Sequence, residues 1–382
     1  MVTNHPHYPD GQTRAGYRAI SVRREVIKGI PVLRLPVIAR PNRGFIDRVI
    51  DQASFAFCAS AAIDAARRAD VMVVESPPLF LGATARWLQA MARTPYVLHV
   101  ADPWPDYPIE LGALRHPLGI RMARALERLA YAGAARITTP TEGCAVMIRQ
   151  QAVARDKVTV LPNSVDVDRF DPDASPELAR SQLGWEERPT IGYVGTVGLA
   201  QGLSTLVDAA AILQTRVGPN GGPLIRVVGE GQDRDGLEAR AGSLGLENLQ
   251  FHGSVPATDV ARVFEACDAT VTLLRKGRMA EAALPTKLVE ALAAGRPIIV
   301  SADGEAADIV RRASAGIATP AEDSLGLAEA ILQLTADPAA RSRMGKHARD
   351  AAVTRFDRRI VVGRLADILT DAVASEAPRH AG

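Results

Sequence analysis

The 382-residue sequence is poor in aromatic residues and in cysteine, and each shortage excludes a class of protein. Phe, Trp and Tyr make up 4% of the chain, which argues against the stacking platforms that bind single-stranded nucleic acid. The cysteines, Cys58, Cys144 and Cys267, lie far apart without a CxxC pair, so we interpret them as small buried residues in a reducing compartment. We expect no metal and no nucleic acid partner.

Long apolar runs and a strong net charge are absent as well. No run reaches the ~18 residues of a transmembrane helix and no signal peptide opens the chain, so the expected protein is cytoplasmic. Net charge is only +2, although arginines gather in the N-terminal half. Arg121, Arg124 and Arg128 lie beside an apolar stripe in the predicted helix 118–132. This pattern predicts either peripheral binding to an anionic membrane on the inner face of the plasma membrane or a solvated helix face.

Strand and helix patterns alternate along the chain. "ADVMVVESPP" and "TPYVLHVADPWPD" are typical of buried strands, and the alternation restarts with "TIGYVG" after a polar, turn-rich stretch. Near-continuous apolar strands between helices indicate parallel sheets covered on both faces. We therefore predict an α/β protein with two Rossmann-like, doubly wound domains facing across a cleft. Residues 1–165, joined by a helix at 357–375, form the first domain, and residues 166–356 form the second.

A glycine-rich turn, "GYVGTVGLAQGLSTLV", links a strand to a helix through Gly192, Gly195, Gly198 and Gly202. Glycines let a backbone approach phosphate closely, but an ordinary tight strand–helix turn also needs them. The spacing differs from the dinucleotide fingerprint GxGxxG, and "VVGEGQ" lacks the third glycine of that fingerprint. A nicotinamide enzyme is therefore disfavoured.

The segment "ALPTKLVEALAAGRPIIV", residues 283–300, carries a lysine where a helix does not favour one. Thr286 is predicted to cap the helix and Gly295 to end it, which leaves Lys287 at the positive end of the macrodipole. An anion bound at the helix start would stabilise Lys287. Glu290 lies on the same face, where it could accept hydrogen bonds from a diol such as ribose. The alternative is a plain exposed ion pair between the two side chains.

Together with "VVGEGQ", "LQFHGSVP", "VLPNSVDVDRF" and "ADPWPDYPIELG", these segments resemble the family 4 retaining glycosyltransferases of the GT-B type. The likeness covers nearly the whole chain and is greatest to bacterial O-antigen and capsule transferases of the fucosamine and N-acetylglucosamine kind. It implies an NDP-sugar donor on the C-terminal domain and a lipid-linked or saccharide acceptor on the N-terminal domain. It also implies metal-independent, cofactor-free transfer with retention in cell-surface polysaccharide synthesis.

The resemblance also implies roles for individual residues. Lys287 would bind the donor diphosphate, Glu290 the ribose and the backbone at residues 252–255 the base. Asp102 and Trp104 would lie on the acceptor side, with Lys287 and Asp102 as the catalytic candidates. The donor-binding residues are Gly195, Thr196, Gly198, Gln201, Gly229, Glu230, His252, Val255, Arg275, Thr286, Lys287, Leu288 and Glu290.

The sequence departs from the family pattern at four places. Ala282 occupies a position that often holds glutamate, and the nearest glutamate is Glu281. Thr196 and Gln201 stand where many members have arginine and lysine, so Arg275 or Arg278 would assist Lys287. The common Asn-Gly before the hinge is Asn163–Ser164.

The largest departure is at the start of the chain. "MVTNHPHYPDG" looks like the end of the family's second strand, so the first strand, its glycine-rich loop and the next helix are expected to be lacking. Either the start codon is assigned too late or the domain is incomplete. Two alternative functions stay open: a catalytically inactive nucleotide-sugar-binding protein, and a sugar-nucleotide epimerase of the same architecture.

Overall fold

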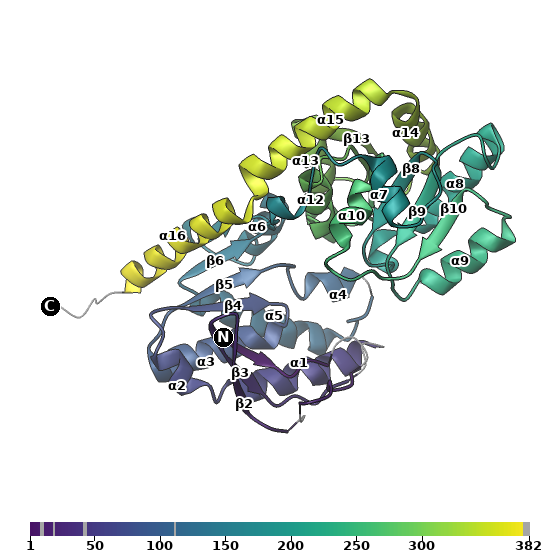
Figure 1. The fold of residues 1–382 in the computed structure, drawn as a ribbon. Helices are drawn as coiled ribbons and strands as arrows, with labels where there is room; N and C mark the ends of the chain where they lie inside the picture. The colour runs from purple at the N-terminus through teal and green to yellow at the C-terminus, as the bar shows by residue number, and fades with distance from the viewer. Residues whose placement is uncertain (8–10, 18–19, 41–43, 111, 377–382) are drawn as a thin grey trace. The chain divides into compact units, whose positions relative to one another are not determined.

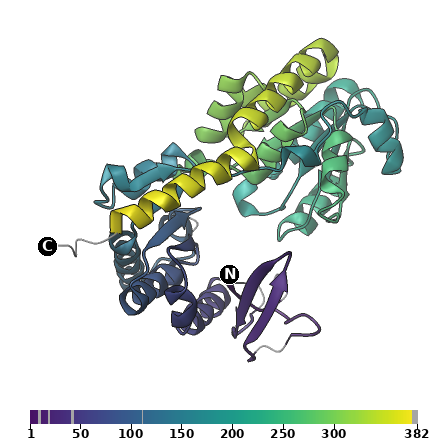
Figure 2. The same cartoon turned by 60° about the vertical axis from the view of Figure 1, so that its left-hand side comes forward.

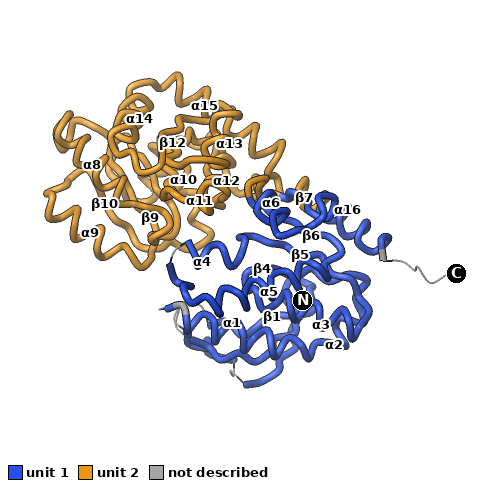
Figure 3. Tube along the Cα trace, turned by 180° about the vertical axis from the view of Figure 1, so that it is seen from behind, with its two compact units in different colours: residues 1–140, 144–161, 365–382 blue, residues 141–143, 162–364 orange. Residues whose placement is uncertain are grey.

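The computed structural model describes residues 1–7, 11–17, 20–40, 44–110 and 112–376 (Figure 1). The chain divides into two compact units (Figure 3). Unit 1 takes in residues 1–140, 144–161 and 365–382, and unit 2 takes in residues 141–143 and 162–364. The C-terminal helix α16 (Arg358–Glu376) therefore begins in unit 2 and ends in unit 1.

Unit 2 is built on a six-stranded parallel sheet in the order β10-β9-β8-β11-β12-β13. Every residue of β8, β9, β11 and β12 is buried, as expected for apolar strands with helices on both faces. The chain order reverses at β8, where doubly wound sheets bind ligands beyond the strand ends. The strands are β8 (Thr190–Val194), β9 (Leu224–Val228), β10 (Leu249–His252), β11 (Ala269–Leu273), β12 (Ile298–Ser301) and β13 (Gly316–Thr319).

Helices cover both faces of this sheet, and the predicted doubly wound architecture is confirmed for unit 2. One core cluster includes residues of α10, α12 and α13, and the other includes residues of α8 and α14. The helices are α7 (Pro176–Gln182), α8 (Ser204–Val217), α9 (Arg234–Ser243), α10 (Val260–Glu265), α11 (Arg278–Ala282), α12 (Thr286–Ala293), α13 (Glu305–Ala313), α14 (Ser324–Ala336) and α15 (Pro338–Ala351).

Helix α12 has the predicted apolar face and the predicted end, but not the predicted cap. Leu288 and Leu292 are fully buried, and Gly295 has the positive φ of 63° that terminates a helix cheaply. Pro285 occupies the N-cap position and Thr286 is already the first helical residue, without a capping hydrogen bond. The prediction that Thr286 caps the helix was wrong, because the extended Pro285 begins the helix one residue earlier.

Unit 1 contains a four-stranded parallel sheet in the order β4-β5-β6-β7 and a separate three-stranded sheet in the order β1-β3-β2 (Figure 2). Its strands are β1 (Val2–Asn4), β2 (Arg23–Ile27), β3 (Ile30–Leu35), β4 (Met72–Ser76), β5 (Tyr96–Val100), β6 (Arg136–Thr139) and β7 (Val158–Val160). Its helices are α1 (Phe45–Ala59), α2 (Ile63–Arg67), α3 (Leu79–Ala92), α4 (Asp106–Glu110) and α5 (Pro117–Gly133), and α6 (Glu142–Arg149) spans the boundary between the units.

Strands β4 and β1 each lie at an edge of their sheet in unit 1. Among the described strands, β4 pairs only with β5 and β1 pairs only with β3. Val73 of β4 is 51% exposed, unlike the buried strands of unit 2. The open edge therefore belongs to β4, while β5 is paired on both sides.

Candidate active site

The turns after β8 and β9 lie directly against each other. The Gly195 N–H donates to the Val228 carbonyl oxygen at 2.9 Å, and the Val197 N–H donates to the Glu230 carbonyl oxygen at 2.9 Å. A Cβ atom on Gly229 would lie 2.0 Å from the Gly195 carbonyl oxygen. Gly195 and Gly229 also have φ values of 141° and 149°. Close backbone approach therefore requires these glycines whether or not a phosphate binds there.

Lys287 reaches from the first turn of α12 to this glycine turn. Its Cε would be 3.1 Å from a Cβ atom on Gly195. Its ammonium donates to the Tyr193 hydroxyl and lies 4.1 Å from the centre of that ring. The Tyr193 hydroxyl in turn donates to the Thr196 carbonyl oxygen at 2.6 Å. Two residues distant in sequence, Lys287 and Gly195, are thus brought together at the carboxyl end of β8.

The Lys287 ammonium has no carboxylate partner among the residues that the structure describes. Burial lowers the pKa of Lys287 to about 7, because little around it compensates for lost hydration. Lys287 and Glu290 form no ion pair in the described chain, so the alternative of an exposed pair was wrong. The arrangement is a half-buried cation beside a glycine turn, with no carboxylate partner among the described residues, which suits an anion.

Glu290 lies one turn further along α12 and is partly buried. Burial raises the pKa of its carboxyl, while the positive charge of Arg169 lowers it. Arg169 also donates to the Ala257 carbonyl oxygen at 2.7 Å. Arg169 thus acts electrostatically on Glu290 and also contacts the loop that follows β10, where the resemblance implies base recognition.

Of the other residues predicted around the phosphates, Gln201 and Arg275 lie at the glycine turn. Gln201 lies over the glycine turn, with its Oε1 3.2 Å from where a Cβ of Gly198 would be. Arg275 packs against Gly202 but is paired with Glu322 at 3.5 Å.

Thr286 and Glu230 are exposed, and Glu230 pairs with Arg234. Leu288 has its side chain fully in the core, which leaves only its backbone for ligand contact, and its N–H donates to the Pro285 carbonyl oxygen.

His252 ends β10 in a cluster that the sequence did not predict. Its Nε2 lies 3.0 Å from Nη1 of the buried Arg226, and its ring centre lies 5.4 Å from that of Trp185. Burial lowers the pKa of His252, and the positive charges of Arg226 and Arg234 lower it further. Val255, in the following loop, packs partly against the core.

In unit 1, Asp102 and Trp104 follow β5, Asp102 exposed and Trp104 half-buried. The three arginines predicted to face a membrane are not equivalent. Arg124 donates to Asp106 at 2.6 Å and to Glu127 at 3.0 Å, whereas Arg121 and Arg128 are exposed. Arg124 is thus occupied within the fold, and the prediction that it faces a membrane has to be corrected.

The sequence analysis missed Tyr193 and left the departure from the family pattern at Ala282 unexplained. Tyr193, the partner of Lys287, was not singled out, although a tyrosine in an otherwise aliphatic strand end was a usable signal. Ala282 is buried, and a Cβ on Gly143 would lie 3.0 Å from it. The Thr141 hydroxyl donates to the Ala282 carbonyl oxygen at 2.6 Å. Ala282 is therefore enclosed by its neighbours, whereas Glu281, the nearest glutamate, is exposed.

In the part of the chain that is described, no three His, Cys, Asp or Glu residues are grouped as metal ligands, and no helix is long and apolar enough to cross a membrane.

Comparisons with known proteins bear on both halves of the chain. The family model "Glycosyl transferase 4-like domain" matches residues 2–164, and the model "Glycosyl transferases group 1" matches residues 176–351. The Escherichia coli K12 protein "Putative colanic acid biosynthesis glycosyl transferase WcaI" is 28% identical over 312 residues, which are 79% of this chain and 75% of that protein. The 2-deoxystreptamine glucosyltransferase of Streptomyces kanamyceticus is 29% identical over 263 residues, 64% of this chain and 65% of that enzyme.

The fold comparison gives the same architecture. The crystal structure of Anabaena HepE in complex with UDP-glucose superimposes with a TM-score of 0.69 at 20% identity, covering 90% of this chain and 86% of that one. At this identity the likeness shows the fold alone. With glycosyltransferase models matching both halves and two Rossmann-like units in the fold, the chain is a GT-B glycosyltransferase related to family 4.

Proposed function

We propose that this glycosyltransferase moves a sugar from an NDP-sugar to a lipid-linked or saccharide acceptor, with retention, in cell-surface polysaccharide synthesis. The observation that carries the proposal is the Lys287 ammonium, which lies half-buried beside the Gly195 turn without a carboxylate partner among the described residues. A diphosphate would supply the missing negative charge. The HepE structure that shares the fold contains UDP-glucose, which supports a nucleotide sugar as the donor here.

In this proposal the residues of unit 2 act on the leaving group. The largest charge to develop during transfer is on the departing diphosphate, and Lys287 would stabilise it. Tyr193 would hold the lysine in position through its hydroxyl and ring. Glu290, one turn deeper in α12, would accept hydrogen bonds from the ribose hydroxyls, and the loop near Val255 would meet the base.

The acceptor side is proposed to lie in unit 1, at Asp102 and Trp104. Asp102 is the candidate for orienting or deprotonating the acceptor hydroxyl. The proposed peripheral membrane contact would use the exposed arginines of α5, Arg121 and Arg128. Leu118 and Met122 of the same helix are 59% and 61% exposed, which gives that surface an apolar component.

One observation favours a second candidate, a nucleotide-sugar-binding protein without activity: the buried Ala282 stands where the family often has a glutamate. Incubating the purified protein with UDP- and GDP-sugars separates the candidates. Transfer or slow donor hydrolysis supports the proposed function, whereas binding without turnover supports the inactive protein. An isomerised donor would instead indicate an epimerase.

A further inference from the structure

The hairpin formed by β2 and β3 ends in an exposed apolar tip. A two-residue turn at 28–29 joins the strands, and Ile27 pairs with Ile30 directly beside it. Val26, Ile27 and Ile30 are 70%, 43% and 54% exposed. Every residue from 26 to 31 is exposed, so three large aliphatic side chains gather at the end of this hairpin, drawn in purple in Figure 2.

The base of the hairpin, in contrast, is tied to the rest of unit 1. Arg34 of β3 pairs with Glu25 of β2 at 2.5 Å. The centre of the Tyr17 ring lies 5.2 Å from the guanidinium carbon of Arg34 and 4.7 Å from that of Arg23. β1 pairs with the other side of β3, and Val32 of β3 is buried. A fixed base therefore presents the apolar tip to its surroundings.

The apolar residues of the tip lie on both faces of the two-stranded ribbon. Residues opposite one another in an antiparallel pair share a face, and neighbours along a strand alternate. Ile27 and Ile30 therefore lie on one face, and Val26 lies on the other with its partner Pro31. A protein surface that packed on one face would leave the other exposed, whereas a lipid interface surrounds an inserted tip on all sides.

The length of the tip suits a bilayer interface. At ~3.3 Å per residue the exposed stretch 26–28 extends about 10 Å. Segments that lie in the interface bury their apolar side chains ~5–10 Å into the boundary between headgroups and acyl chains. The tip is therefore long enough to reach this boundary and too short to cross a membrane.

The charges around the tip favour an anionic surface. Arg24 and Lys28 are exposed and form no ion pair with a residue that the structure describes. Glu25 is the only acidic residue of the sequence between positions 20 and 40, and Arg34 already holds it. Two copies of this cationic hairpin would repel each other at the β2 edge, whereas anionic headgroups would attract both free cations. Charge complementarity thus selects a lipid surface over a second copy of the chain.

We propose that the β2–β3 tip inserts into the interface of an anionic bilayer. Val26, Ile27 and Ile30 would lie below the headgroups, and Arg24 among them. The long Lys28 side chain would reach back from the turn to the headgroups. The inference goes beyond the proposed function, because it needs neither the donor site nor the exposed arginines of α5.

The test measures sedimentation of the full chain with phosphatidylglycerol vesicles, and phosphatidylcholine vesicles are the neutral reference. We expect the double variant Ile27→Ser, Ile30→Ser to bind phosphatidylglycerol vesicles about tenfold more weakly, because two apolar side chains lose their burial in lipid. The double variant Ile27→Leu, Ile30→Leu should bind as wild type does. Leu178→Ser is the matched control, because Leu178 is a 60% exposed aliphatic residue of α7 in unit 2, and its vesicle binding should not change.

The charge is tested separately from the apolar contact. Arg24→Gln should weaken binding to phosphatidylglycerol about fivefold and leave binding to phosphatidylcholine unchanged. All these variants should unfold at the denaturant concentration of wild type, because the replaced side chains are exposed. Insertion itself is read from Ile27→Trp, whose fluorescence brominated lipids should quench, whereas the added fluorescence of Leu178→Trp should not be quenched.

Several results would overturn the inference: no binding of wild type to phosphatidylglycerol, unchanged binding of the serine double variant, an equal loss in Leu178→Ser, or no quenching in Ile27→Trp. If wild type self-associates without lipid and the serine double variant does not, the tip binds a second copy instead. Loss of binding in Arg121→Gln but not in the serine double variant would place the contact on α5 alone. Titration of UDP into the serine double variant should give the wild-type affinity, which keeps this test separate from the donor site.

Discussion

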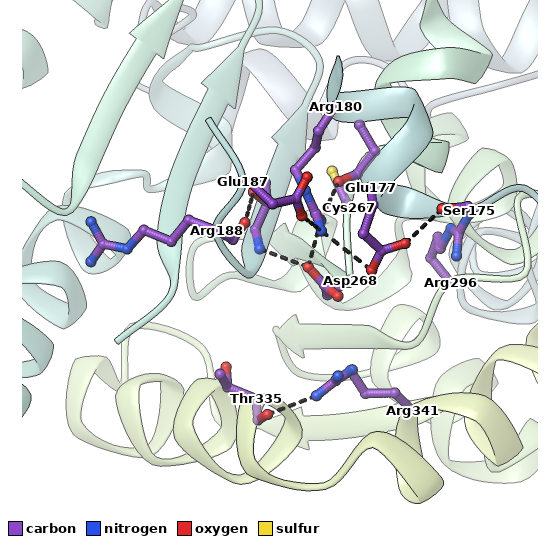
Figure 4. Close-up of polar contacts among 12 residues, drawn as sticks. Ser175, Glu177, Arg180, Glu187, Arg188, Cys267, Asp268, Arg296, Thr335 and Arg341 are labelled. Carbon is purple, nitrogen blue, oxygen red and sulfur yellow. Dashed lines mark hydrogen bonds and ion pairs between the residues drawn. The ribbon is translucent and has the colours of Figure 1, made fainter. Parts of the chain in front are cut away.

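Unit 2 holds two cations near opposite ends of its parallel strands, the buried Arg180 and the half-buried Lys287, and their surroundings differ. Arg180 of α7 is 3% exposed and donates to Asp268 and to Glu187, both at 2.9 Å, near the start of β11 and β8 (Figure 4). Glu177 adds a contact at 3.5 Å. Among the described residues, Lys287 at the carboxyl end of β8 has only the Tyr193 hydroxyl and ring as partners.

The difference is that carboxylates of the fold neutralise the charge of Arg180, whereas the described residues provide no carboxylate for Lys287. Burying a charge costs several kcal/mol unless partners compensate. For Arg180 the carboxylates outweigh burial and raise its pKa, whereas for Lys287 burial dominates and lowers the pKa to about 7. A cation without a carboxylate partner at the strand ends where doubly wound sheets bind ligands is a functional-site signal, and Lys287 meets that description while Arg180 does not.

The largest effect is expected from removing Arg180, the cation that carboxylates of the fold already surround. Arg180→Met should destabilise the protein by about 3–5 kcal/mol, because Asp268 would stay partly buried without its partner. The affinity of the folded protein for UDP or GDP should not change. Chemical denaturation measures the loss, with Arg216→Gln as a control that breaks an exposed pair with Glu329 and should cost at most about 1 kcal/mol. If Arg180→Met lost as little stability as the control, Arg180 and its carboxylates would not have the stabilising role assigned to them.

The next effect is on binding rather than on stability. Lys287→Ala should leave the fold intact or slightly more stable, because a half-buried cation without a carboxylate partner among the described residues and its macrodipole penalty disappear. Nucleoside diphosphates should bind ten- to a hundredfold more weakly, about 1.5–3 kcal/mol. Calorimetric titration of UDP, GDP and ADP decides the matter. Unchanged affinity for all three nucleotides would leave Lys287 with a structural role only.

The two cations should also differ in how stability depends on pH. In the folded, ligand-free protein Lys287 has a pKa of about 7, below its unfolded value of 10.5, so the unfolded chain binds more protons between these values. Stability should therefore rise with pH from about 7 to 10.5, by at most about 1.4 kcal/mol per pH unit. Lys287→Met should lose this slope, and Arg180→Met should retain it. An equal slope in wild type and Lys287→Met would contradict the low pKa.

Much of this comparison could be predicted from the sequence, but not its decisive contact. The alternation of apolar strands and helices predicted two doubly wound units, and the misplaced helix-start lysine and the glycine turn each pointed to an anion. The contact of Lys287 with the glycine turn through Tyr193 could not be predicted. It depends on strand register and on how α12 packs near β8, which involve segments about a hundred residues apart. For the same reason the sequence could not tell that Arg124 is paired or that Ala282 is enclosed.

A smaller effect is expected at Glu290, and it tests whether this residue of α12 binds the ribose. Glu290→Gln should weaken UDP and GDP by about 1 kcal/mol, because a neutral amide accepts from the ribose hydroxyls less strongly than a carboxylate. The 2′,3′-dideoxy analogues lack the diol and should bind wild type and variant alike. Calorimetry on matched ribo- and dideoxy-nucleotides tests this. An equal loss for both nucleotide series would show that Glu290 acts on something other than the ribose.

The smallest effect is expected in unit 1, where the paired Arg124 should behave differently from the exposed Arg121 and Arg128. Arg128→Gln or Arg121→Gln should each weaken binding to anionic vesicles by at most about 1 kcal/mol at low salt, because each removes one exposed charge near the lipid surface. Arg124→Gln should not weaken vesicle binding, because Asp106 and Glu127 already hold that guanidinium, but it should lower stability. Sedimentation with phosphatidylglycerol and phosphatidylcholine vesicles measures the first quantity and denaturation the second. Equal partition of wild type to both vesicle types would mean that the exposed arginines of α5 form a solvated face.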